Sequence, residues 1–152
     1  MRYHFVDRIL ELESGRQIVA EKVVSRSEVS GRHLRAAQLL ETMAQAAGWL
    51  AKESQGFTRL PLLAKVPELE ILRYPQAGEK LRIEARIEGQ RSDCMALSVS
   101  LAVETEPLAR ARLLLYLMQP PAGRSGELAD LARDHFRSLT EAASRRILSS
   151  QA

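Results

Sequence analysis

Two side chains of the types that move protons near neutral pH, Glu41 and His33, lie close together in the sequence. A carboxylate and an imidazole can act as general acid and general base when both reach one reacting group. Glu41 is the only acid between Ala36 and Lys52, and Gln45 follows it by four residues. On a helix that spacing brings two side chains together. We therefore expect Glu41 to be a functional or ligand-facing carboxylate that a hydrogen bond from Gln45 could orient. The alternative is a solvated or salt-bridged residue on the helix surface.

His33 is the candidate imidazole partner of Glu41, and Gly31 is a candidate for substrate binding. If both residues lay on one helix, eight residues would separate His33 and Glu41 by about 12 Å, too far for direct cooperation, whereas cooperation across a dimer interface would remain open. Gly31 could expose its backbone N–H to a substrate carbonyl near the start of the helix. The alternatives are a solvated loop histidine and an ordinary turn glycine. His4 and His135 are weaker candidates.

The element that must position Glu41 is a helix over residues 36–52. Its apolar side chains recur at helical spacing and include many alanines, whereas charged residues are few. A helix this apolar in a small protein is usually covered by a sheet. The residues that mark the apolar pattern are Leu39, Leu40, Met43, Ala44, Ala47 and Leu50.

Strand patterns flank this helix. Residues 17–24 are rich in β-branched side chains, and alternating runs at 80–87, 94–103 and 108–118 are joined by short turns, which predicts an antiparallel meander. Two further apolar runs, 62–66 and 68–74, precede it. The predicted fold is therefore α+β, an antiparallel sheet wrapped around one long central helix. It occupies residues 1–119 and is followed by a linker (120–126) and an added amphipathic C-terminal helix (127–149).

Length and composition limit the function classes. The 152 residues suit one domain, and the net charge of +3 comes from basic residues interleaved with acids, which does not favour nucleic-acid binding. Cys94 is the single cysteine, so it cannot form an internal disulfide or anchor a cysteine-based zinc site, and we expect a buried structural thiol. No run is long enough for a signal peptide or a membrane span, which favours a cytoplasmic location.

Three segments, residues 5–13, 39–48 and 74–81, resemble segments that occur in the same order in the 3-hydroxyacyl-[acyl-carrier-protein] dehydratases (FabZ/FabA-like), which have a hot-dog fold. Residues 5–13 resemble the opening Val-Asp-Arg-(Ile/Val)-Leu-Glu segment of that family. Residues 39–48 resemble its central helix, and residues 74–81 resemble its Pro-Val-x-Pro-Gly-Asp-x-Leu turn. The similarity covers about residues 3–118 in the right order, and it implies a hot-dog domain with the helix at its centre.

The resemblance also implies an activity. Family members eliminate water from 3-hydroxyacyl thioesters to give 2-enoyl thioesters, with a His and a Glu that meet across a homodimer interface. Acyl carrier protein or CoA would carry the substrate, and no metal or redox cofactor would be needed. Glu41 and Gln45 match the family pattern. However, residues 27–35 lack the prolines of the His-Phe-Pro-Gly motif, and His33 lies eight residues before Glu41 instead of fourteen.

Because of that departure, three interpretations stay open. The chain could be a dehydratase-like lyase with a rearranged histidine motif, in which Glu41 works with His33. It could be a hot-dog thioesterase, in which the helix carboxylate serves as nucleophile or base and no histidine is required. It could also bind acyl carriers without catalysis. All three predict a homodimer or higher homo-oligomer, with Trp49 and Met43 in the core or beside the acyl chain.

Overall fold

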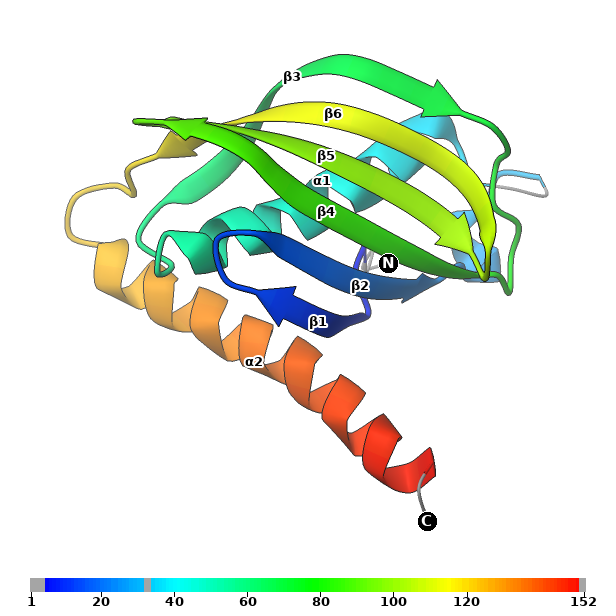
Figure 1. Cartoon of the computed structure of the whole chain (residues 1–152). Coiled ribbons are helices and arrows are strands. Elements are labelled where there is room, and N and C mark those ends of the chain that lie inside the picture. Colours follow the sequence, from blue (N-terminus) through cyan, green and yellow to red (C-terminus); the bar gives the residue numbers. More distant parts are fainter. Residues whose placement is uncertain (1–4, 32–33, 151–152) are drawn as a thin grey trace.

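The computed structural model describes residues 5–31 and 34–150, and the side chains in these ranges except at positions 125 and 142–150. A six-stranded sheet, in the order β1-β2-β4-β5-β6-β3, curves around α1 (Ala36–Ser54), which crosses behind it in Figure 1. Every pair of neighbouring strands is antiparallel. The strands are β1 (Arg8–Glu13), β2 (Gln17–Val23), β3 (Leu60–Ile71), β4 (Lys80–Arg91), β5 (Cys94–Val103) and β6 (Glu106–Met118).

The core lies between α1 and the inner face of the sheet. Alternate residues of β4 and β5 point inward, and Leu81, Ile83 and Met95 are fully buried. The facing side of α1 combines large residues with alanines, and the alanines let helix and sheet approach closely. The predicted sheet around one central helix is therefore confirmed. The fully buried apolar residues of α1 are Leu39, Met43, Ala46, Ala47, Leu50 and Ala51.

Strand β3 corrects the expectation of two separate apolar runs. Residues 60–71 form one strand, which pairs with β6 and lies at an edge of the sheet formed by the described strands. Its pairing shifts register between Leu63 and Lys65 and again between Lys65 and Glu68. Pro67 cannot donate a ladder hydrogen bond, and an edge strand with irregular pairing tolerates this loss. The apparent break in the sequence is thus a bulged region within one long strand.

The expectation of a buried thiol at Cys94 is wrong. Cys94 is exposed, and it is the first residue of β5, directly after the turn that follows β4. Because side chains alternate along a strand, the burial of Met95 and Leu97 turns Cys94 to the outer face.

The added C-terminal helix is confirmed. α2 (Ser125–Ser150) contacts β1 and extends past the sheet in Figure 1. It docks beside α1 through an aromatic cluster, in which the Phe136 ring lies 5.9 Å from Trp49 and 5.4 Å from Phe57 between centroids. Arg133 also donates a 2.9 Å hydrogen bond to the Gly56 carbonyl oxygen. The helix begins two residues before the predicted position, and the division of the chain at residues 119 and 126 stays a prediction.

No helix within the described residues is long and apolar enough to cross a membrane. Nor does that part of the chain bring together three His, Cys, Asp or Glu side chains that could hold a metal ion.

Candidate functional site

One face of α1 borders a cavity of about 290 Å³ between the helix and strand β3. The helix contributes Glu41, Gln45, Gly48 and Lys52 to its lining. Their successive spacings of four, three and four residues keep all four on one side of a helix with 3.6 residues per turn. A polar stripe thus runs along an otherwise apolar helix, with a carboxylate near one end and an ammonium group near the other. The remaining lining residues are Ala44, Pro61, Leu62, Leu63 and Leu115.

Glu41 and Gln45 lie together in this stripe as the sequence indicates. The Gln45 side-chain amide donates a 2.8 Å hydrogen bond from Nε2 to Oε1 of Glu41. The bond fixes one carboxylate oxygen and leaves the other available to a ligand, because a carboxylate has several acceptor sites. Both residues are partly buried. The expected hydrogen bond is therefore present, whereas the catalytic role of Glu41 stays a prediction.

Lys52 is the cavity-lining charge that the sequence analysis did not select. Its Nζ lies 4.4 Å from the centroid of the Trp49 ring, a cation–π contact. Burial lowers the pKa of the Lys52 ammonium group, because desolvation disfavours the charged form. The spacing of eleven residues from Glu41 was the signal that could have found it, since eleven residues are close to three full helical turns.

Strand β3 supplies the wall opposite the stripe. A Cβ added to Gly48 would lie 3.8 Å from Cγ of Pro61, so the helix and the strand approach closely here. The neighbouring Leu62 and Leu63 are 48% and 40% exposed, although both are large and apolar. This wall therefore carries apolar surface at the open edge of the sheet.

The segment that leads into α1 is held by polar contacts. A short helix, η1 (Arg26–Glu28), places Glu28 Oε2 2.7 Å from Nζ of the buried Lys22. Gln38 then links this segment to α1, because its Nε2 donates a 3.0 Å hydrogen bond to the Glu28 carbonyl oxygen and its Oε1 accepts one from the Arg35 N–H. The start of the central helix is thereby fixed relative to β2.

Gly31 lies in a turn of this segment with φ of 76°, a left-handed conformation that favours glycine. It does not line the cavity, so the proposed contact of its N–H with substrate stays a prediction. His33 and His4 lie outside the described residues. His135 lies on α2, where its ring packs edge-on against Trp49 with 5.0 Å between centroids, and it does not line the cavity either.

No family model matches the sequence. The chain is 33% identical over 94 residues to the 3-hydroxyacyl-[acyl-carrier-protein] dehydratase FabZ of Symbiobacterium thermophilum, an alignment that spans 57% of this chain and 66% of that relative, just under two thirds of its length.

Solved structures share the fold at low sequence identity. The protein smu.793 of Streptococcus mutans, bound to acetyl CoA, superposes with a TM-score of 0.65 and 11% identity over 74% of this chain and 88% of its own. A hypothetical thioesterase of Streptococcus pneumoniae with coenzyme A gives a TM-score of 0.64 and 14% identity over 74% of this chain and 85% of its own. The chain is a divergent hot-dog protein. Its α1 is the central helix of that fold, and the stripe from Glu41 to Lys52 is the polar side of this helix.

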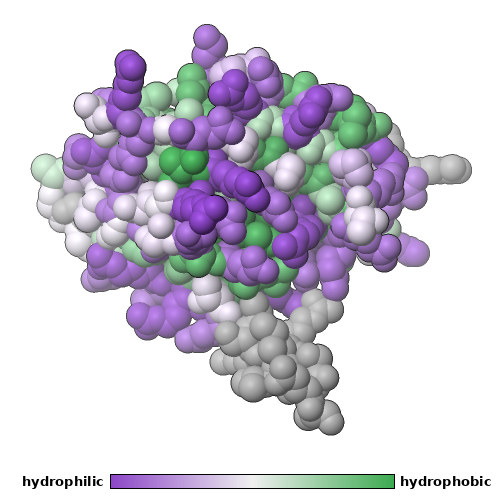
Figure 2. All heavy atoms as spheres, in the orientation of Figure 1, coloured by the Kyte–Doolittle hydropathy of each residue, from purple (hydrophilic) through white to green (hydrophobic). Residues whose placement is uncertain are grey.

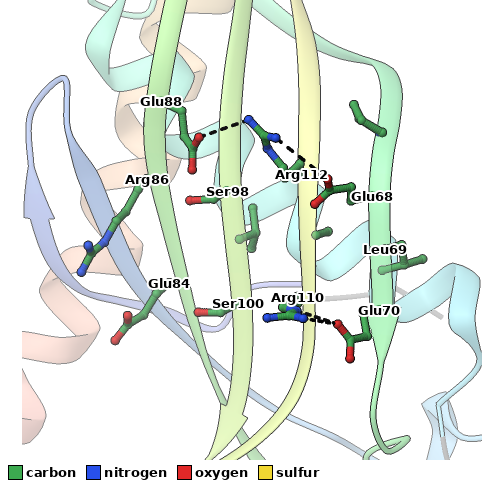
Figure 3. A pocket seen from close by; sticks show the side chains of 13 residues that line it. Glu68, Leu69, Glu70, Glu84, Arg86, Glu88, Ser98, Ser100, Arg110 and Arg112 are labelled. Carbon is green, nitrogen blue, oxygen red and sulfur yellow. Dashed lines mark hydrogen bonds and ion pairs between the residues drawn. The ribbon is translucent and has the colours of Figure 1, made fainter.

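The hot-dog sheet carries a second, larger hollow of about 870 Å³ on the face away from α1 (Figure 3). Glutamates and arginines line it, and most of the arginines pair with acids in the same hollow. Arg110 lies 2.6 Å from Glu70, and Arg112 lies 3.4 Å from Glu88. In Figure 2 the same face alternates between hydrophilic and hydrophobic patches. Such mutual pairing is typical of the solvated side of an antiparallel sheet, and we place the candidate site at α1 instead.

Proposed function

We propose that this hot-dog protein acts on acyl thioesters of acyl carrier protein or CoA, with Glu41 as its acid–base residue. The observation that carries the proposal is the partly buried carboxylate of Glu41, held by Gln45 in a cavity between the central helix and β3. A positioned carboxylate within reach of a substrate can transfer protons in the transition state. The dehydratase relative and the neighbours with bound acetyl CoA or coenzyme A support this substrate class.

Elimination of water from a 3-hydroxyacyl thioester is the reaction we propose first. The Glu41 carboxylate removes a proton from C2, and the electron pair of that C–H bond forms the C2–C3 double bond. The bond between C3 and the hydroxyl oxygen breaks, and the hydroxyl group leaves as water after it gains a proton. His33 is the proposed donor of that proton, and the Gly31 N–H is the proposed donor to the thioester carbonyl oxygen. The reaction requires no metal or redox cofactor.

Hydrolysis of the thioester is the second candidate, because one feature of the cavity favours it. Among the described residues that line the cavity, Glu41 is the only carboxylate and no histidine is present. Hydrolysis needs one base: Glu41 removes a proton from water, and the oxygen attacks the thioester carbon. The carbon–sulfur bond then breaks, and protonated Glu41 returns the proton to the leaving sulfur, which gives a thiol and a carboxylic acid. A protein described as a hypothetical thioesterase, among the solved structures of the same fold, supports this candidate.

Paired assays separate the two reactions. Hydration of a 2-enoyl thioester and hydrolysis of a saturated acyl thioester would be measured for wild type, Glu41→Gln and His33→Ala. Glu41→Gln preserves the shape and can still accept the hydrogen bond from Gln45, so stability should stay near that of wild type. Removal of a general acid or base should lower the rate by about 10²–10⁴. Glu53→Gln is the matched control, because Glu53 lies on the same helix and does not line the cavity.

Loss of hydration in both Glu41→Gln and His33→Ala would support the dehydratase. Loss of hydrolysis in Glu41→Gln, with His33→Ala unaffected, would support the thioesterase. A Glu41→Gln protein as active as wild type would remove Glu41 from the mechanism, and a wild type inert on both substrates would leave acyl-carrier binding without catalysis.

A further inference from the structure

Lys52 is a cation that borders the cavity between α1 and β3. Within the described part of the chain, no carboxylate lies within 4.0 Å of its ammonium group. The Lys52 side chain borders the cavity, and its Nζ lies 4.4 Å from the centroid of the Trp49 ring. A partly desolvated ammonium group without a counterion gains strongly from an anion, because the interaction is weakly screened there.

The position of Lys52 relative to Glu41 sets the size of ligand that could reach both. Eleven residues at 1.5 Å per residue separate them by about 16 Å along the helix. Gly48 lies between them and has no side chain to interrupt the cavity, while Pro61 and Leu62 of β3 form the facing wall. An extended ligand can therefore lie along the stripe with one end at Glu41 and the other at Lys52.

We propose that Lys52 binds an anionic group of the thioester ligand, at the end of the cavity opposite Glu41. This inference rests on the proposed function, because Glu41 marks the place of the thioester. Two anions have the required chemistry, namely the phosphate of a phosphopantetheine arm and a terminal carboxylate on the acyl chain. Either would lie on an extended ligand whose thioester is near Glu41.

A purely structural role for Lys52, as a cation near the C-terminal end of α1, explains its position less well than anion binding does. A lysine in the last turn of a helix interacts favourably with the helix dipole, and an exposed side chain would obtain that benefit without desolvation. Here Lys52 lies over Trp49 and borders the cavity, where burial lowers the pKa of its ammonium group. An anionic ligand would offset this desolvation cost, since an opposite charge favours the protonated form.

The test uses three non-hydrolysable thioether probes and measures their dissociation constants by titration calorimetry. The first is dodecyl pantetheine, which is neutral, the second is dodecyl phosphopantetheine, and the third is pantetheine with a dodecyl chain that ends in a carboxylate and can extend from Glu41 to Lys52. Wild type should bind one of the two anionic probes at least about tenfold more tightly than the neutral probe. The probe that gains identifies the source of the anion.

Lys52→Met should remove this preference and leave the affinity for the neutral probe unchanged, because methionine retains most of the apolar stem. Lys52→Arg should restore the preference. Lys65→Met is the matched control, since Lys65 is an exposed lysine of β3 outside the cavity, and it should retain the preference. Thermal unfolding of each variant checks that the fold persists.

Equal affinity of wild type for all three probes would overturn the inference about Lys52 while leaving thioester binding in place. So would a preference that survives in Lys52→Met. If none of the three probes binds to wild type, the proposed function and this inference both fail.

Discussion

The ion pair between Lys22 and Glu28 makes the interior of this protein sensitive to a single substitution. Nζ of Lys22 lies 2.7 Å from Oε2 of Glu28, and the two side chains are 1% and 9% exposed. Ser25 completes the pairing of Glu28, because its hydroxyl group and its backbone N–H donate hydrogen bonds of 2.7 Å and 3.2 Å to Oε1. Since this cluster fixes η1 and the entry into α1, its loss should weaken the whole domain.

The expected magnitude follows from the burial of both charges. Lys22→Met removes the cation and leaves the Glu28 carboxylate buried, a change that typically costs about 3–5 kcal/mol in the free energy of unfolding. For a domain of this size, each kcal/mol shifts the unfolding midpoint by about 2–4 °C, so we expect a decrease of about 6–20 °C. The double variant Lys22→Met/Glu28→Gln contains no charge at the site, and we expect it to recover most of that loss.

The same pair predicts a pH dependence of stability. Burial raises the pKa of Glu28. Hydrogen bonds from Lys22 and Ser25 lower it by more than burial raises it, so the folded-state pKa lies below the ordinary value. The stabilisation is therefore fully present above about pH 4.3, the unfolded-state pKa of a glutamate, and is lost as pH falls through the lower folded-state value. In Lys22→Met burial acts without the cation, so the deficit relative to wild type should shrink as the solution is acidified from pH 7 toward pH 4.

Urea unfolding of wild type, both single variants and the double variant at pH 7 and pH 4.5 measures these effects as a double-mutant cycle. A Lys22→Met loss below about 1 kcal/mol at pH 7, or a double variant less stable than Lys22→Met, would refute the reasoning. A deficit that grows on acidification would refute the assignment of the pH dependence to Glu28.

Three further outcomes are expected. The apolar edge that β3 leaves open in the sheet predicts that the protein forms at least a dimer, and Leu62→Lys should weaken this association. Light scattering that shows a monomeric wild type at micromolar concentration would contradict this. Gly48→Ala should stabilise by about 0.5–1 kcal/mol in urea unfolding, because the added methyl group would make an ordinary contact at 3.8 Å, and a destabilised variant would disprove it. Phe136→Ala should destabilise by about 1–3 kcal/mol through lost contacts with Trp49 and Phe57, and thioester binding should persist; loss of binding with an intact fold would instead connect α2 to the site.

The local sequence pattern was sufficient to predict the central helix and the contact between Glu41 and Gln45 on it. The four-residue spacing of Glu41 and Gln45 determines that they meet once the segment is helical, and the 2.8 Å hydrogen bond agrees. The meander β4-β5-β6 could also be predicted from the sequence, because its turns are short and apolar and polar residues alternate along its strands.

Other features needed information that a short stretch of sequence does not contain. Alternation around Cys94 gave the period of β5, but burial of Met95 against α1 set which residues point outward. The two runs around Pro67 became one strand because β6 pairs with residues on both sides of the bulge. These outcomes depend on long-range pairing, which local propensity does not encode.

In the candidate site, too, the sequence determined some features and the tertiary structure determined others. Helical periodicity by itself places Glu41, Gln45, Gly48 and Lys52 on one side of α1, since that depends only on the angle between successive residues. Which structure faces that side was decided by the tertiary fold, because β3 is held beside α1 in a sheet where its residues Pro61 and Leu62 pair with Leu117 and Tyr116 of the distant strand β6. The stripe is therefore a property of the sequence, and the cavity is a property of the strand that closes it.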